Sequence, residues 1–107
     1  MKSNSKKIVY ICSPFSGNVE KNTEAAKRYC QFAIDKGYIP FAPHLLLPQF
    51  MNEETERELA LEFDISYLDR CDELWVCGPI ISRGMKKEIE YALAKEKKMM
   101  IRRFENI

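Results

Sequence analysis

A serine, a glycine and a glutamate at helical spacing form the pattern in this sequence that most strongly indicates a reactive or ligand-binding site. The residues are Ser82, Gly84 and Glu88, and they follow a short apolar run at residues 74–77. The unpaired N–H groups and the positive dipole end at a helix start favour an anion there. Glu88 shares its helix face with Met85, and we expect this face to pack against a sheet. A partly desolvated carboxylate in that position is typical of a catalytic acid, base or nucleophile.

A second carboxylate, Asp64, interrupts an apolar row of another expected helix. The row consists of Ala60, Asp64, Leu68 and Cys71. Burial of an aspartate costs free energy unless the carboxylate is paired or hydrogen-bonded, so Asp64 is the second candidate for a functional role. The structural alternative is that Asp64 caps a loop or pairs with an arginine at the rim of the fold.

The other candidates also have structural interpretations. Glu88 is a favourable acid near a helix start, and Ser82 is a good helix N-cap. A lone histidine after a strand, such as His44, is more often a satisfied structural residue. Their common position at one edge of the expected fold, rather than any single residue, indicates a functional site.

Apolar runs alternate with amphipathic segments along the chain. A continuous apolar run is typical of a strand buried on both faces, and an apolar stripe at helical spacing is typical of a surface helix. The alternation predicts a small three-layer α/β domain of the flavodoxin or Rossmann type, with a parallel sheet of four or five strands. We expect strands at residues 8–12, 39–42, 73–77 and 98–103, helices at residues 19–36, 53–70 and 84–95, and a loop at residues 43–52.

The loops that follow the strands are where we expect a ligand. Open parallel sheets bind ligands beyond the carboxyl ends of their strands, at the point where the strand order reverses. In this chain those loops lie at residues 13–18, 43–52 and 78–83. Within or next to them are the candidate ligand-binding residues Ser13, Ser16, Gly17, His44, Ser82 and Gly84.

Length and composition narrow the class of protein. The chain is long enough for one domain, and we expect residues 1–107 to form it with residues 1–6 disordered. The formal charge of +1 gives no electrostatic reason to expect a nucleic-acid polymer or a membrane as partner. The four cysteines form no CxxC pair, and there is one histidine, so we expect no disulfide, metal or cofactor. No targeting or membrane-spanning run is visible, which favours a cytoplasmic protein.

An apolar stretch at residues 45–51 stands out within the expected loop. It contains three consecutive leucines and, after a short polar break, Phe50 and Met51. Contiguous exposed apolar surface usually marks an interface. The stretch therefore predicts a contact in a homodimer or higher homo-oligomer, or a lid over a pocket. An interaction protein that binds another partner through this stretch is a weaker alternative.

Three segments together resemble the nucleoside 2-deoxyribosyltransferase superfamily. They are residues 10–17 (YICSPFSG), residues 64–72 (DISYLDRCD) and residues 82–92, where the pattern SxGxxxE is the most distinctive part. The nearer resemblance is to the 2′-deoxynucleoside 5′-monophosphate N-glycosidases and to small relatives of the DUF4406 type. The resemblance extends over residues 7–100.

The resemblance implies a role for several residues. Glu88 matches the nucleophile that attacks the anomeric carbon of deoxyribose, and Tyr10 matches a tyrosine that holds this nucleophile by a hydrogen bond. Asp64 matches an aspartate that assists protonation of the departing base or orients the sugar. The resemblance also implies contacts to the substrate: Ser13 or Ser16 and Ser82 to the 5′-phosphate, Gly17 and Gly84 through their backbone, and His44 near the ligand.

The implied activity is cleavage of the N-glycosidic bond of a deoxynucleoside 5′-monophosphate. The transferases that act on free nucleosides have an acid where this chain has Ser82, which favours a phosphate-bearing ligand. Water that resolves a glycosyl-enzyme makes the protein a hydrolase, whereas a second base makes it a transferase. A deoxyribosyltransferase and a non-catalytic nucleotide-binding module of the same fold stay open as alternatives.

Overall fold

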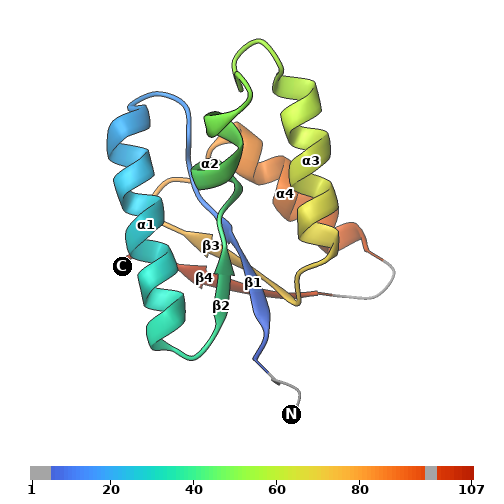
Figure 1. Ribbon diagram of the computed structural model, residues 1–107. Helices are drawn as coiled ribbons and strands as arrows, with labels where there is room; N and C mark the ends of the chain where they lie inside the picture. Colours follow the sequence, from blue (N-terminus) through green and yellow to red (C-terminus); the bar gives the residue numbers. More distant parts are fainter. Residues whose placement is uncertain (1–5, 96–98) are drawn as a thin grey trace, which may run out of the picture.

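The four apolar runs pair as one parallel sheet. The computed structural model describes residues 6–95 and 99–107, and Figure 1 shows the strands among the helices. The strand order is β2-β1-β3-β4, so the chain adds β2 on one side of β1 and β3 on the other. All neighbouring pairs are parallel. The strands are β1 (Ile8–Cys12), β2 (Ile39–Phe41), β3 (Glu73–Cys77) and β4 (Met100–Phe104).

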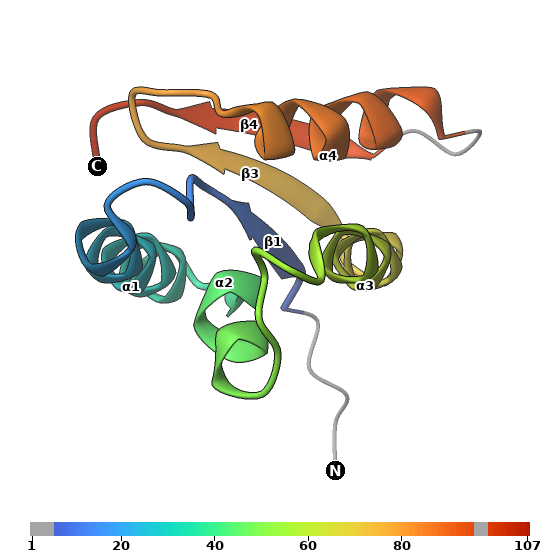
Figure 2. The same ribbon diagram turned by 90° about the horizontal axis from the view of Figure 1, so that it is seen from above.

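The helices cover both faces of this sheet. Helix α1 (Val19–Asp35) packs on one face, and α3 (Arg57–Asp69) and α4 (Arg83–Ala94) pack on the other, as can be followed in Figure 2. The short helix α2 (Pro43–Leu46) and the 3₁₀ helix η1 (Leu47–Gln49) follow β2. The predicted three-layer α/β fold with a parallel sheet is therefore confirmed, with four strands.

The two faces of β1 serve different helices, because side chains alternate along a strand. Val9 and Ile11 belong to the cluster on the α1 face, whereas Tyr10 and Cys12 belong to the cluster below α3 and α4. All four side chains are at most 1 % exposed. The clusters are completed by Tyr29, Ala33, Trp75 and Cys77 on the α1 face and by Leu68, Leu74, Val76, Met85 and Ala92 on the other.

The segment after β2 is not the loop that the sequence predicts. It forms α2, with Pro43 in the first turn, where a missing N–H loses no helical hydrogen bond, and then η1. The prediction was wrong because a four-residue helix is too short to show a periodicity. The apolar stretch is also only partly exposed, since Leu47 is fully buried whereas Phe50 is 66 % exposed.

Helix α3 begins at Arg57 and not at Glu53 as predicted. The preceding residues form turns around Asn52, whose Oδ1 accepts hydrogen bonds from two following backbone N–H groups. Glu56 Oε1 in turn accepts a hydrogen bond from the N–H of Asn52. Such local bonds compete with helical ones, so the acidic residues before Arg57 stay outside the helix.

The other boundaries that fall on described residues lie within one residue of the prediction. Helix α1 ends at Asp35, and Gly37 follows with a φ of +90°, a left-handed conformation that glycine adopts without steric cost. Strand β2 ends at Phe41, one residue early, and β4 ends one residue later than predicted. The predicted start of β4 at Lys98 lies outside the described residues, as do residues 1–5 of the segment 1–6 that is predicted to be disordered.

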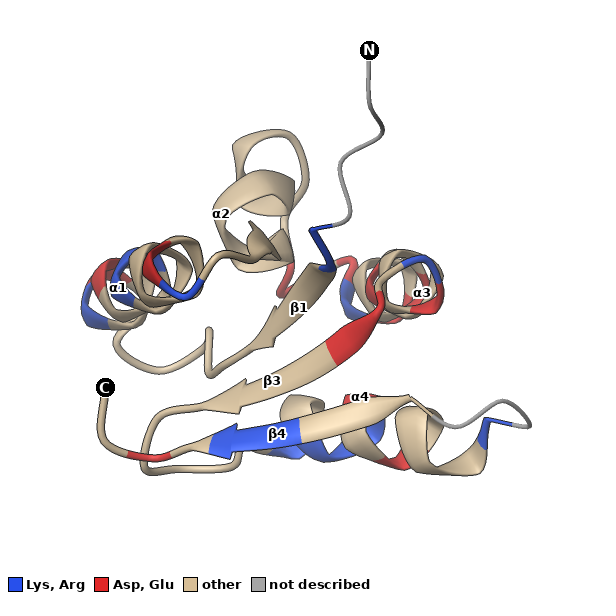
Figure 3. Ribbon diagram, turned by 90° about the horizontal axis from the view of Figure 1, so that it is seen from below, with Lys and Arg blue, Asp and Glu red and all other residues tan. Residues whose placement is uncertain are grey.

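Charges of both signs are distributed along α1, α3 and α4, as Figure 3 shows. A buried exception is Glu73 at the start of β3, whose Oε1 lies 2.9 Å from Arg102 Nε on β4. Along the described residues, no helix is both long and apolar enough to span a membrane.

Candidate active site

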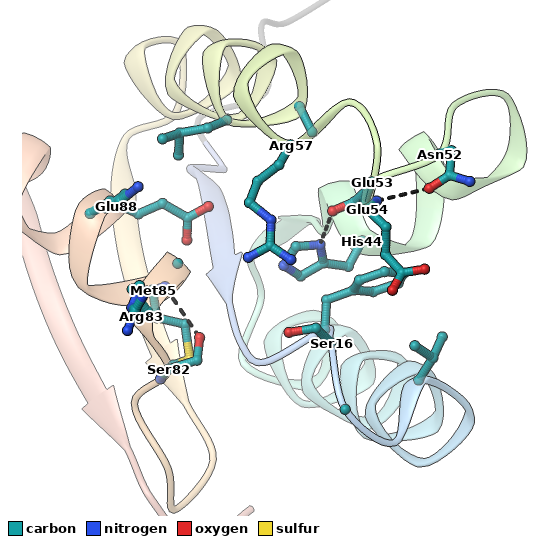
Figure 4. A pocket seen from close by; sticks show the side chains of 17 residues that line it. Ser16, His44, Asn52, Glu53, Glu54, Arg57, Ser82, Arg83, Met85 and Glu88 are labelled. Atoms are coloured by element: carbon teal, nitrogen blue, oxygen red, sulfur yellow. Dashed lines mark hydrogen bonds and ion pairs between the residues drawn. The ribbon is translucent and has the colours of Figure 1, made fainter.

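A cavity of about 440 Å³ opens at the carboxyl ends of β1 and β3, the two strands between which the sheet order reverses. Open parallel sheets bind their ligands at this place, and the volume falls in the range of ~300–1,000 Å³ for small-molecule sites. The loop after β1, α2, the first turns of α3 and the start of α4 form its wall, which Figure 4 shows from close by.

Glu88 is held in this wall by two hydrogen-bond donors from β1. Ser82 caps α4 by accepting the N–H of Met85 over 3.3 Å. This start turns Glu88 toward the sheet, where it is 3 % exposed. The Tyr10 hydroxyl donates to Glu88 Oε2 over 2.7 Å, and the Cys12 thiol donates to Oε1 over 3.2 Å. Each carboxylate oxygen therefore has its own donor.

Burial and hydrogen bonding act on the pKa of Glu88 in opposite directions. Burial has the largest effect and raises the pKa above its ordinary value. The hydrogen bonds from Tyr10 and Cys12 stabilise the charged form and limit this rise, as does the nearby His44. Burial, and then the charge of Glu88, raise the pKa of Tyr10 and of Cys12 well above their ordinary values, so both groups keep their protons and stay donors.

Asp64 lies near Glu88 on the inner face of α3. It is 5 % exposed, and its Oδ1 has no hydrogen-bond partner among the described residues. Burial, followed by the charges of Glu88 and Glu53, raises the pKa of Asp64 to about 8. Two carboxyl groups in such contact titrate as a pair. At neutral pH we expect this pair to hold one proton. Because Glu88 accepts two hydrogen bonds that stabilise its charged form, we assign this shared proton to Asp64.

His44 and Phe15 form an aromatic part of the wall. Their rings stack with centroids 5.0 Å apart and planes at 26°, and His44 lies across the cavity from Glu88 in Figure 4. His44 Nδ1 is 3.5 Å from Glu53 Oε1, an ion pair whenever the imidazole is protonated. Stacked rings at a cavity wall present a flat face that suits a planar ligand ring.

The structure brings most of the predicted site residues together at this cavity. Tyr10 and Asp64 do not line it but are buried beside Glu88. Ser13 is 2 % exposed and does not line the cavity, so Ser16 is the accessible serine of the first loop. The predicted residues that do line it are Ser16, Gly17, His44, Ser82, Gly84 and Glu88.

Three cationic residues also line the cavity: Lys87, whose positive charge the sequence places beside the expected pocket wall, and Arg57 and Arg83, which were not among the predicted site residues. Their side chains are exposed and form no hydrogen bond or ion pair with any described residue. Figure 4 shows Arg57 reaching from α3 into the cavity. Arg57 precedes Asp64 by seven residues, which places both on one helix face. That spacing was a usable signal in the sequence once Asp64 had been chosen.

Cys12 and Phe15 were missed as well. Cys12 follows Tyr10 by two residues and therefore shares its strand face, a signal that the sequence does contain. The contact between Phe15 and His44 joins two loops far apart in the chain, and no local pattern predicts it. Nor do histidine, cysteine, aspartate and glutamate side chains of the described residues form a group of three that could hold a metal ion.

The arrangement can perform nucleophilic and acid–base chemistry at one place. A carboxylate with two donors and a carboxylic acid with a raised pKa form the pair used where glycosidic bonds are cleaved. In that pair, the ionised group attacks or stabilises positive charge, and the neutral group supplies a proton.

The comparisons with known proteins agree with this fold. The chain is similar to the solved structure of a 2-deoxyribosyltransferase from Bacillus psychrosaccharolyticus, with a TM-score of 0.56 and 22% sequence identity. The similarity covers 78% of this chain and 62% of that chain, so this chain spans less than two thirds of that enzyme. At this identity the likeness shows the fold alone. No curated protein matches the chain.

A family profile matches residues 7–104, which include all the strands and helices described above and every residue that lines the cavity. The chain therefore belongs to the family described as Domain of unknown function (DUF7768).

Proposed function

We propose that the protein hydrolyses the N-glycosidic bond of deoxynucleoside 5′-monophosphates with Glu88 as the nucleophile. The observation that carries this proposal is a pair of buried carboxyl groups, Glu88 in the cavity wall and Asp64 beside it. Glu88 accepts two hydrogen bonds, whereas Asp64 has a pKa of about 8 and an Oδ1 without a partner among the described residues. Cleavage through a glycosyl-enzyme requires such a division between a carboxylate and an acid.

In the first step, a carboxylate oxygen of Glu88 attacks C1′ of the sugar. The bond between C1′ and oxygen forms while the bond between C1′ and the base nitrogen breaks. The electron pair of the broken bond goes to the base, which takes a proton from Asp64 and leaves. The positive charge that develops on the sugar is stabilised by the nearby carboxylate.

In the second step, water attacks C1′, and the ester bond to Glu88 breaks with its electron pair returning to the carboxylate. The proton of the water goes to Asp64, which restores the acid. Esterification of Glu88 removes a negative charge that raises the pKa of Asp64. The pKa of Asp64 therefore falls between the two steps, so Asp64 remains deprotonated until water supplies the proton.

The cationic lining supports a substrate with a phosphate group. Arg83 and Lys87 are one turn apart on α4 and line the cavity next to Ser82. The start of a helix and unpaired cations both favour an anion. The acidic residues Glu53 and Glu54 lie on the opposite rim. We therefore place the 5′-phosphate on the α4 side of the cavity.

Base transfer is the second candidate function. In that reaction a second base, instead of water, attacks C1′ of the glycosyl-enzyme and takes up the deoxyribosyl group. The likeness of the fold to a 2-deoxyribosyltransferase supports this candidate.

A turnover assay tests both candidates. The purified protein is incubated with each deoxynucleoside 5′-monophosphate, and separately with each free deoxynucleoside plus a second base, and chromatography measures the released and exchanged bases. Glu88→Gln serves as the blank. Hydrolysis predicts base release from a monophosphate by the intact protein only. Exchange without release would favour the transferase, and binding without either product would favour a nucleotide-binding module.

We also propose a homodimer or higher homo-oligomer. Apolar side chains remain exposed at the end of η1 and on the outer face of α3, namely Phe50 (66 %), Leu59 (40 %) and Phe63 (36 %). Exposed apolar surface commonly marks an interface. Light scattering during size-exclusion chromatography is expected to give at least twice the chain mass, and Phe50→Ser is expected to shift the mass toward the monomer. A monomeric wild-type protein would overturn this proposal.

A further inference from the structure

We propose that Cys12 is a positioning residue for Glu88: its thiol, together with the Tyr10 hydroxyl, keeps the Glu88 carboxylate ionised and in one orientation. The inference deepens the proposed function and rests on it for its catalytic consequence. The contact on which it is built is a feature of the fold itself, because both residues lie inside the cluster below α3 and α4.

The geometry gives each oxygen of Glu88 a separate partner. Tyr10 Oη is 2.7 Å from Oε2, and Cys12 Sγ is 3.2 Å from Oε1. The Met85 carbonyl is a second acceptor for the thiol, but it lies farther away, at 4.0 Å. A thiol is a weak donor, and a charged acceptor strengthens the hydrogen bond that it makes. The carboxylate is therefore the preferred partner of the thiol.

Bulk solvent does not reach the thiol in the intact protein. Cys12 is fully buried and Glu88 is 3 % exposed. A carboxylate that loses a donor in such a buried environment loses stabilisation of its charged form. The burial also argues against a reactive thiol, because reactive cysteines are partially exposed.

Several ionisable groups face Glu88 from different elements. Tyr10 and Cys12 come from β1, Asp64 comes from α3, and His44 comes from α2. The two groups of β1 are neutral donors that favour the charged form of Glu88, whereas a negative charge on Asp64 would oppose it. Removal of the thiol should therefore shift the shared proton toward Glu88. A Glu88 that carries this proton cannot attack C1′.

The first experiment compares Cys12→Ala, Cys12→Ser and the control Cys77→Ala in the turnover assay across pH. Cys77 is also a fully buried thiol, but it packs on the opposite face of the sheet, with its Sγ 3.6 Å from the Trp75 carbonyl oxygen. We expect Cys12→Ala to lower kcat/KM by about 3- to 10-fold and to move the acidic limb of the profile to higher pH. Cys12→Ser keeps a donor, so its kcat/KM and its acidic limb should be close to those of the wild type. Cys77→Ala should change neither kcat/KM nor the acidic limb.

A second readout needs no substrate. Glutamate labelled with ¹³C at the side-chain carboxyl allows titration of Glu88 by NMR, with Glu88→Gln to assign the signal. The proposal predicts a higher pKa for Glu88 in Cys12→Ala than in the wild type, and no such rise in Cys12→Ser. If Cys12→Ala does not fold, Cys12→Val fills more of the space without a donor and takes its place.

The two readouts separate the possible failures. An unchanged Glu88 titration in all Cys12 variants, with only a lower melting temperature, would overturn the proposal and leave Cys12 as a core residue. An inactive wild-type protein in which Cys12→Ala still raises the pKa of Glu88 would support the contact and contradict the hydrolase function.

Discussion

Glu73 and Glu88 are both buried, at opposite ends of the sheet, but their surroundings stabilise a negative charge to different extents. Glu73 begins β3 and is 1 % exposed, whereas Glu88 is 3 % exposed. Glu73 Oε1 accepts hydrogen bonds from Trp75 Nε1 (2.8 Å) and Arg102 Nε (2.9 Å), and Lys7 Nζ lies 3.7 Å from Oε2. The Glu88 carboxylate has two neutral donors instead.

The comparison shows that burial alone does not decide the state of a carboxyl group. Burial is the largest influence in both cases and raises the pKa. At Glu73 the hydrogen bonds and the charges of Arg102 and Lys7 together outweigh burial, so the pKa is lowered. At Glu88 the neutral donors do not outweigh it, and the pKa is raised. The charge of Glu73 is thus balanced by cations of the fold. The charge of the Glu88–Asp64 pair is not balanced in this way, which lowers stability but makes the pair suitable for catalysis.

Glu88→Gln is expected to have the largest effect on activity. Base release should fall by at least about 1,000-fold, because a neutral amide cannot form the glycosyl ester. The free energy of unfolding, measured by urea denaturation, should stay within about 1 kcal/mol of the wild type, because the substitution removes a buried charge. If Glu88→Gln did not fold, Glu88 would be a structural residue like Glu73, and the contrast between the two glutamates would be contradicted.

Asp64→Asn should lower kcat by about 100-fold or more, because the leaving base loses its proton donor. Its effect on stability should depend on pH. The pKa of Asp64 rises from an ordinary 3.8 to about 8, so the folded wild type holds an extra proton between these values and loses stability as pH rises through this window. The variant lacks this loss. The melting temperature of Asp64→Asn, relative to that of the wild type, should therefore rise between pH 5 and pH 8. A difference in melting temperature that stays constant over this range would contradict the raised pKa of Asp64.

Glu73→Gln should show the opposite pattern, a loss of stability without a loss of activity. Removal of the charge leaves Arg102 and Lys7 without their buried partner, which should cost roughly 2 kcal/mol at pH 7. The lowered pKa means that this stabilisation is present above the ordinary value of 4.5 and is lost as pH falls below it. Urea denaturation should therefore show a smaller difference in the free energy of unfolding between Glu73→Gln and the wild type at acidic pH than at neutral pH. Reduced turnover per folded molecule would show that the two ends of the sheet are coupled.

Among the variants at Glu88, Asp64 and Tyr10, Tyr10→Phe should lower activity least. Loss of one of the two donors raises the pKa of Glu88 further, so kcat/KM should fall by about 10-fold and the acidic limb of the pH profile should move upward. Tyr29→Phe is the matched control, because Tyr29 is buried in the cluster on the α1 face. Equal losses in both variants would indicate a general packing defect.

The parts of the fold that follow a regular period could be predicted from the sequence. The strands and α1 match the predictions within one residue at every boundary that was predicted on a described residue. The burial of Glu88 and Asp64 also follows from helix periodicity. The turns around Asn52 could not be predicted, because side-chain hydrogen bonds decide them. Neither could the contact of Phe15 with His44, since it depends on how separate loops meet.

The alternation of side chains in β1 restricts how this protein can evolve. Tyr10 and Cys12 face Glu88, while Val9 and Ile11 fill the core on the α1 face. Insertion or deletion of one residue in this strand would exchange the two faces, so the donors and the core would be lost in a single mutational event. Substitutions in the loop after β1, in α2, in the turns before α3 and at the start of α4 change the cavity wall and leave the register of β1 unaffected.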